Sequence, residues 1–130
     1  MTTNNSKSAA AQAAPASGAG LTTLDPGAGY VTTINTYTVA PERAEEVLDY
    51  LVRSALETVR CVPGFVSMNF HVSLDRTQIV NYGQWKSREA IAAARENPKI
   101  VALMSETARI AGSSKPTPYE LRQSVAAASE

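Results

Sequence analysis

The sequence predicts an α+β fold in which helices cover one face of a four-stranded antiparallel sheet. Apolar and polar residues alternate in four short segments and recur at steps of three and four in longer ones, with Pro, Gly and Ser between them. The elements then follow in the order β-α-β-β-α-α-β, which is a split βαβ arrangement. A chain of 130 residues has room for one hydrophobic core.

The first two elements are a strand and the most clearly patterned helix of the chain. β-branched and aromatic residues interleaved with Thr and Asn predict a strand over Tyr30–Val39. Pro41 suits the first turn of a helix, and the apolar spacing continues that helix to Arg60, before Pro63 and Gly64 end it. One stripe along this helix is apolar: Leu48, Leu51, Val52, Ala55, Leu56 and Val59.

A β-hairpin is predicted next, from two strands over Phe65–Ser73 and Gln78–Trp85 that are joined by a short polar turn. Because successive strand residues point to opposite faces, the first strand sorts into an apolar and a polar set. The apolar set is Val66, Met68, Phe70 and Val72, and the polar set is Ser67, Asn69 and His71.

Two helices and a last strand complete the domain. Ser87 is a favourable N-cap for a helix that runs to Glu96, where Asn97 and the proline after it break the pattern. A second apolar stripe predicts a helix over Lys99–Ala111, and alternation predicts a short strand over Thr117–Gln123.

We expect a tail on each side of one folded domain at residues 30–123. Residues 1–29 consist mainly of Ala, Ser, Thr, Asn, Gly and Pro, so they bury too little apolar surface to offset the entropy of ordering. They are predicted to form a disordered N-terminal tail. Residues 124–130 have a similar composition and are predicted to fray.

Composition excludes several classes of function. Lys and Arg number 12 and Asp and Glu number 12, so no excess charge attracts nucleic acid or an anionic membrane surface. No apolar run suits a membrane span or a signal peptide, which predicts a cytoplasmic protein. One cysteine, Cys61, and one histidine, His71, are too few for a standard zinc site, so we expect no metal site.

With helices on one face, the other face of the sheet is left uncovered. A sheet face that carries Val, Met, Phe and Ile is unfavourable in water, so the simplest arrangement packs a second copy of the chain against it. The pattern therefore predicts a homodimer.

The candidate site lies on the second strand of the hairpin. Asn81, Gly83 and Trp85 share one face, with Asn81 and Trp85 roughly 13 Å apart along the strand. Gly83 offers only a hydrogen there, which predicts a recess flanked by an amide and an indole N–H, and both groups donate hydrogen bonds to a carbonyl or phenolate oxygen. The alternative is that Trp85 is a core residue and that Asn81 satisfies a neighbouring backbone group.

Three further residues are candidates for the same pocket. His71 is the one side chain whose ordinary pKa lies near neutrality, and the hairpin register decides whether it shares a face with Asn81. Asn35 and Tyr37 share a face of the first strand and either line the pocket or pack in the core. Cys61, at the end of a helix, is predicted to be a packing residue.

Three motifs carry a family resemblance: VPGFVS at 62–67, HVSLDRT at 71–77 and VNYGQWKSREA at 80–90. With them, residues 30–123 resemble the antibiotic biosynthesis monooxygenase family, in particular the cofactor-independent anthrone oxygenases of aromatic polyketide pathways of the actinorhodin type. The resemblance implies a ferredoxin-like fold and a dimeric α/β-barrel assembly. It also implies oxidation of a polycyclic phenol or anthrone to a quinone by O₂, without flavin, haem or metal.

In residue terms, the resemblance implies that Asn81 and Trp85 hydrogen-bond the substrate oxygens and that His71 and Phe70 line the pocket. Ile91 stands where related oxygenases carry a tyrosine. Met104 stands near their arginine, with Arg109 further along, while Arg95 and Arg109 either lie on solvated helix faces or turn inward to hold an anion. These departures leave two alternatives open: a non-catalytic ligand-binding or accessory protein of the same fold, and a haem-degrading monooxygenase.

Overall fold

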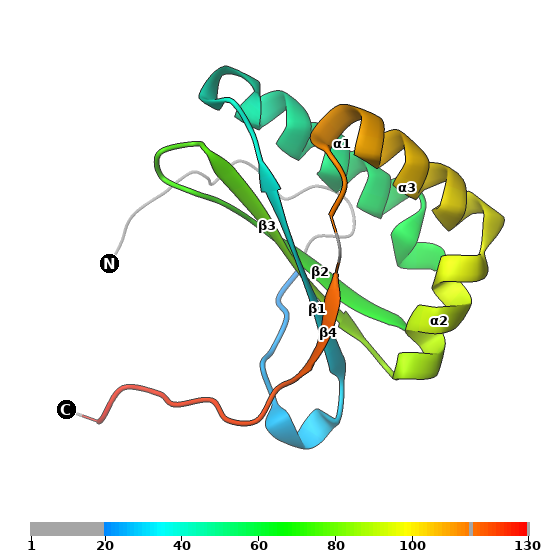
Figure 1. Cartoon of the computed structure of the whole chain (residues 1–130). Coiled ribbons are helices and arrows are strands. Elements are labelled where there is room, and N and C mark those ends of the chain that lie inside the picture. Colours follow the sequence, from blue (N-terminus) through cyan, green and yellow to red (C-terminus); the bar gives the residue numbers. More distant parts are fainter. Residues whose placement is uncertain (1–19, 115, 130) are drawn as a thin grey trace.

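The computed structural model describes residues 20–114 and 116–129 of the chain. Its sheet comprises β1 (Val31–Thr38), β2 (Phe65–Val72), β3 (Gln78–Trp85) and β4 (Thr117–Glu120) in the order β2-β3-β1-β4, with every neighbouring pair antiparallel. The described helices α1 (Ala44–Glu57), α2 (Arg88–Glu96) and α3 (Pro98–Ala111) all lie on one face of this sheet (Figure 1). The predicted split βαβ fold is confirmed.

The first helix differs from the predicted continuous one. A 3₁₀ turn, η2 (Pro41–Arg43), precedes α1, and a second 3₁₀ turn, η3 (Val59–Cys61), follows it. Thr58 leaves the helical conformation with φ −126°, and the turn after it directs Val59 into the core. The apolar stripe thus continues past the end of the helix, because the chain bends toward the sheet.

The two later helices begin at side-chain caps. The Ser87 hydroxyl accepts a hydrogen bond from the Ala90 N–H at 3.0 Å, as the N-cap prediction requires. Asn97 does more than end α2, since its Oδ1 accepts from the Lys99 N–H at 2.9 Å and caps α3, which begins at Pro98. Ser87 thus begins α2 directly after β3, and Asn97 forms the turn between α2 and α3.

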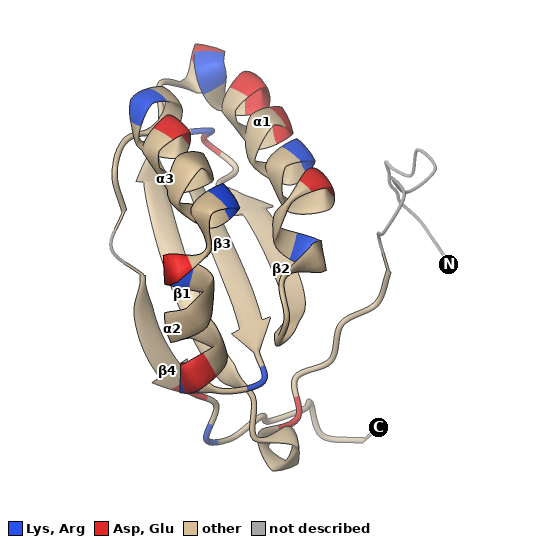
Figure 2. Ribbon diagram, turned by 90° about the vertical axis from the view of Figure 1, so that its right-hand side faces the viewer, with Lys and Arg blue, Asp and Glu red and all other residues tan. Residues whose placement is uncertain are grey.

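The core forms two clusters between the sheet and the helices. The first surrounds Trp85, which packs edge to face on Phe65 with ring centroids 5.5 Å apart. The second cluster contains Tyr37, Val47, Leu51 and Ile79. Strands β1, β2 and β3 contain no Lys, Arg, Asp or Glu, and Figure 2 shows the charged residues on helices and turns instead. The sheet side of the space between the sheet and the helices therefore carries no acidic side chain and no Lys or Arg from β1, β2 or β3.

The outer face of the sheet differs from the prediction. The apolar residues of β2, such as Met68 and Phe70, face the helices, so they are not the exposed surface on which the homodimer prediction relied. Polar residues on the outer face are buried instead: the Ser67 hydroxyl donates to Gln84 Oε1 at 2.6 Å, and Gln84 Nε2 donates to the Thr23 carbonyl at 3.0 Å. The pattern argument for a dimer loses its basis, although Ile34, Val80 and Tyr82 on this face stay half-buried.

The predicted N-terminal tail also differs where the structure describes it. Residues 1–19 lie outside the described residues, whereas residues 20–29 run along the outer face of the sheet and include a 3₁₀ turn, η1 (Pro26–Ala28). The Thr22 hydroxyl donates to Asn69 Oδ1 at 2.8 Å, and Asp25 caps η1. At the other end, β4 stops at Glu120, and residues 124–129 are exposed without regular structure. None of the described helices is both long and apolar enough to cross a membrane.

Candidate active site

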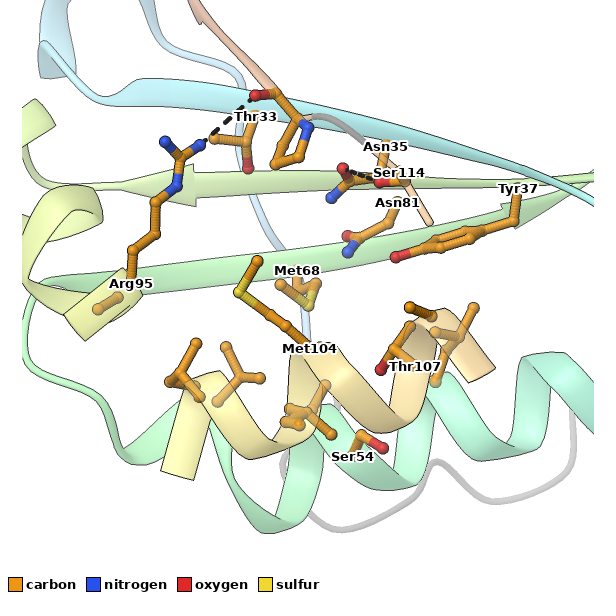
Figure 3. A pocket seen from close by; sticks show the side chains of 18 of the residues that line it. Thr33, Asn35, Tyr37, Ser54, Met68, Asn81, Arg95, Met104, Thr107 and Ser114 are labelled. Carbon is orange, nitrogen blue, oxygen red and sulfur yellow. Dashed lines mark hydrogen bonds between the residues drawn. The ribbon is translucent and has the colours of Figure 1, made fainter. Parts of the chain in front are cut away.

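A cavity of about 450 Å³ lies between the sheet and the helices (Figure 3). Its polar wall comes from the sheet, where Thr33, Asn35, Tyr37 and Asn81 face inward. The helical side is mostly apolar, with Leu51, Ala55, Val59, Ile91, Ala94, Ile100, Val101, Leu103, Met104 and Ala108, and it also carries Ser54, Arg95, Ser105 and Thr107. A flat ligand would thus meet the amides and the phenol of the strands on its sheet side and mainly apolar side chains on its helical side.

The register of the strands places the polar residues in rows. Asn81 of β3 lies directly between Phe70 of β2 and Asn35 of β1. In the adjacent row Gly83 lies between Met68 and Thr33. Asn35 and Phe70, which are far apart in sequence, are therefore the immediate neighbours of Asn81 on the cavity side.

Among the described residues, Asn81 has a buried side-chain oxygen that lacks a hydrogen-bond partner. The residue is 5% exposed, and its Oδ1 is buried without a hydrogen-bond partner. Such an acceptor costs about 1–3 kcal/mol of stability relative to a paired one. Because the amide points into the cavity (Figure 3), a ligand with a hydrogen-bond donor would satisfy it.

Trp85 lines the cavity beside Asn81, but the recess predicted over Gly83 is filled. A Cβ atom on Gly83 would lie 2.9 Å from Thr33 Oγ1 and 3.6 Å from Trp85 Nε1. The glycine therefore permits the indole N–H and a threonine hydroxyl to approach the strand closely, which corrects the prediction of an open space. The indole nitrogen lies over the strand, on the side of Asn81.

Asn35 and Tyr37 line the cavity, so their predicted place on the cavity wall agrees with the structure. The Ser114 hydroxyl, from the loop after α3, donates to Asn35 Oδ1 at 2.5 Å. Burial raises the pKa of the Tyr37 phenol above its ordinary value of 10.0, while a hydrogen bond with Ser114 opposes this and nearby Tyr50 adds to it. At neutral pH Tyr37 is consequently a neutral hydrogen-bonding group.

His71 is not part of the cavity, and its predicted place in the site is wrong for the single chain. Its partner in the register is Val80, so it points to the outer face, opposite to Asn81 and Phe70. The side chain is exposed and does not line the cavity. The sequence could not decide this, because the hairpin turn allows either register and a shift of one residue reverses the faces.

Comparison with known proteins identifies the family. The model of the family described as "antibiotic biosynthesis monooxygenase" matches residues 30–105, which is more than half of the chain. The chain belongs to the antibiotic biosynthesis monooxygenase family. The family predicted from the three motifs is thus confirmed, and the protein is a monooxygenase related to polyketide oxygenases.

Individual relatives support this assignment. The tetracenomycin-F1 monooxygenase of Streptomyces glaucescens is 39% identical over 80 residues, which are 62% of this chain and 71% of the relative. The structure of the ActVA-Orf6 monooxygenase of Streptomyces coelicolor, in complex with nanaomycin D, is 26% identical. The two structures superpose with a TM-score of 0.68, and the match covers 80% of this chain and 96% of the ActVA-Orf6 chain. SnoaB, a cofactor-independent oxygenase from Streptomyces nogalater, is 26% identical with a TM-score of 0.61, over 75% of this chain and 97% of its own.

The helices carry different side chains from those that the resemblance implied for related oxygenases. Ile91 is buried and lines the cavity, so an apolar side chain stands where the family resemblance implied a tyrosine in related oxygenases. Met104 lines the cavity and stays half exposed, whereas Arg109 pairs with Glu106 on the surface and does not reach the cavity. Arg95 lines the mouth and donates to the Pro116 carbonyl at 3.5 Å. It is the cation nearest to the ligand space among the described lining residues.

Sequence reasoning missed several polar residues of the cavity lining, among them Thr33 and Ser114. Thr33 shares a strand face with Asn35 and Tyr37, so its parity was a usable signal. Ser114 lies in a loop, where no periodicity indicates which way a side chain points.

Proposed function

We propose that this monooxygenase oxidises a polycyclic phenol or anthrone to a quinone with O₂ and without a cofactor. The observation that carries the proposal is the partnerless Oδ1 of Asn81, buried in the wall of a largely apolar cavity of about 450 Å³. A cavity of this kind suits a fused-ring ligand that carries an oxygen on one edge. The likeness to a tetracenomycin-F1 monooxygenase and to an oxygenase solved with nanaomycin D supports an aromatic substrate.

The substrate supplies the electrons in this reaction. Loss of a proton from an anthrone gives an electron-rich enolate, which transfers one electron to O₂, and the two radicals combine to a peroxide. The peroxide then collapses so that the CH₂ carbon becomes C=O, and both hydrogen atoms leave with the second oxygen atom as water. The protein needs to stabilise the oxyanion, exclude bulk water and direct protons.

The residues of the cavity are assigned to those tasks. The Asn81 amide and the Trp85 indole N–H hydrogen-bond the substrate oxygen, and Phe70, Ile91 and the helices hold the rings. Because no carboxylate or imidazole lies among the described lining residues, we propose that solvent water at the open side of the cavity accepts the substrate proton. There the Arg95 guanidinium favours the anionic substrate.

The proposal is tested with anthrone in air-saturated buffer. We expect anthraquinone to form faster than in protein-free and heat-denatured controls, with one O₂ consumed per quinone and no accumulation of hydrogen peroxide. Dialysis against EDTA should leave the rate unchanged. A rate equal to the spontaneous background, for anthrone and for hydroxylated anthrones alike, would refute the function.

A second candidate is a binding protein that holds such a ligand without oxidising it. The absence of a base from the described cavity lining favours it, as does the apolar Ile91. It predicts tight ligand binding without O₂ consumption. Haem degradation is a weaker alternative, since the single histidine lies outside the cavity, and a haem titration without a Soret shift would exclude it.

The proposal includes a homodimer that packs through the outer face of the sheet. Its support is the family membership and the half-buried apolar residues Ile34 and Val80 on that face. Light scattering coupled to size exclusion should give twice the chain mass of 13.8 kDa. A monomer at micromolar concentration would contradict it.

A further inference from the structure

The loop between α3 and β4 brings a serine against the polar wall of the cavity. Ser114 is half-buried, lines the cavity and donates its hydroxyl proton to Asn35 Oδ1 at 2.5 Å (Figure 3). A serine hydroxyl has a single proton. That proton is therefore used on Asn35.

This hydrogen bond determines which end of the Asn35 amide is left for a ligand. The oxygen of the amide is occupied by Ser114, so the group that remains for the cavity is the NH₂, a pure donor. Asn81 presents the opposite case, because its buried oxygen is an acceptor without a partner. The fixed donor of Asn35 thus complements the free acceptor of Asn81.

The two amides are close enough to act on one ligand atom. Asn35 and Asn81 are directly opposite each other on β1 and β3, and side chains so paired have Cβ atoms about 4.5–5.5 Å apart. A hydroxyl group is a neutral group that donates and accepts at a single oxygen. A quinone carbonyl or an aryl ether accepts but cannot donate, so it would leave Asn81 Oδ1 unpaired.

We propose that Ser114 is a positioning residue that fixes Asn35 as a donor, so that Asn35 and Asn81 together bind one phenolic hydroxyl of the substrate. This deepens the proposed function and rests on it for the class of ligand. Oxidation of a phenol to a para-quinone by O₂ yields the quinone and water, and it converts the bound hydroxyl to a carbonyl. The pair then loses its donor from the ligand, which weakens product binding and favours release.

The test measures binding and needs no turnover. Trp85 is the only tryptophan of the chain and lies in the cavity wall, so quenching of its fluorescence reports occupancy. The probes are 2-hydroxyanthraquinone and 2-methoxyanthraquinone, which differ in one hydrogen-bond donor. Wild-type protein should bind the hydroxy compound about tenfold more tightly. Equal affinities, or no binding of either compound, would overturn the proposal.

Variants separate positioning from packing. Ser114→Ala should reduce the preference to about twofold or less while the methoxy compound binds as before, and Ser114→Thr should restore the preference. The exposed neighbour Ser113 provides the matched control, since Ser113→Ala should keep it. Equal weakening of both ligands in Ser114→Ala would show a packing role and refute the inference.

Two further measurements keep the result decisive. Asn35→Leu removes the donor itself and should abolish the preference even if Ser114→Ala does not fold, and an unchanged preference in Asn35→Leu would refute the inference. Oxygen uptake with anthrone tests the proposed function separately. If the protein prefers the hydroxy compound but takes up no O₂, the positioning role is supported and the oxygenase function is refuted. If it takes up O₂ without this preference, the oxygenase function is supported and the positioning role is refuted.

Discussion

The two faces of the central sheet carry the same kinds of amide side chain, but hydrogen bonds use them differently. On the outer face Gln84 is buried and uses both ends of its amide, on Ser67 and on the Thr23 carbonyl. On the cavity face Asn81, three residues earlier on the same strand, is equally buried and leaves its oxygen unpaired.

The difference teaches which face stabilises the fold and which is available to a ligand. A buried polar group that is paired contributes about 0.5–1.5 kcal/mol, and an unpaired one costs about 1–3 kcal/mol. The outer face therefore contributes to stability by attaching residues 20–29 to the sheet. The unpaired oxygen on the cavity face lowers stability, and under the proposed function a bound ligand would pair it.

The largest effect is expected from substituting these two amides in parallel. Asn81→Leu should lower kcat for anthrone oxidation by about 10²–10³-fold, because it removes the amide NH₂ that would donate a hydrogen bond to the developing oxyanion. It should also raise the free energy of unfolding by about 1 kcal/mol, since the unpaired oxygen is gone.

Gln84→Leu should do the reverse, with kcat within about twofold and a loss of about 1–3 kcal/mol of stability. Stopped-flow kinetics and urea unfolding measure both quantities. If the two variants shifted stability in the same direction, the contrast between the faces would be incorrect.

The next effect concerns the close approach at Gly83 on the cavity face. Gly83→Ala places a Cβ 2.9 Å from Thr33 Oγ1, so the threonine and the Trp85 indole must shift. We expect a loss of about 1–3 kcal/mol in the free energy of unfolding and a lower kcat/KM. Gly20→Ala, with no atom within 4 Å of the added Cβ, is the control. Recovery in the double variant with Thr33→Ala would confirm the cause, and no recovery would reject it.

A smaller effect is expected from alkaline pH. Burial raises the pKa of the Tyr37 phenol above 10.0, so above about that pH the unfolded chain has lost this proton while the folded chain still holds it. The free energy of unfolding should therefore fall as the pH rises above about 10. Urea unfolding between about pH 8 and pH 11 should show a weaker fall in Tyr37→Phe than in wild type. The exposed Tyr119 supplies the control, and an equal slope in Tyr37→Phe and wild type would contradict the assignment.

The smallest effect is expected at His71, on the outer face. Because the side chain is exposed and points away from the cavity, His71→Ala should change kcat by less than about twofold and stability by less than about 0.5 kcal/mol. Anthrone oxidation and thermal unfolding measure these values. A tenfold fall in kcat would mean that the cavity uses His71 from a second copy of the chain.

Helices and strands could be predicted where the residues of one segment determine its conformation. Alternation marked β2 and β3, Ser87 marked the start of α2, and strand parity put Asn81 and Trp85 on one face. The end of α1 was placed too late, since the apolar stripe continues into η3 and periodicity does not register a change from α-helix to 3₁₀ turn.

The sequence by itself determined the order of the elements, the family and the shared strand face of Asn81 and Trp85, because these depend on local pattern and motif. The tertiary structure decided which face of the hairpin meets the helices, and so excluded His71 and admitted Phe70. It also brought Ser114 to Asn35 across 79 positions of chain. Register and loop placement depend on packing between segments distant in sequence, and a pattern of period two or 3.6 contains no information about that packing.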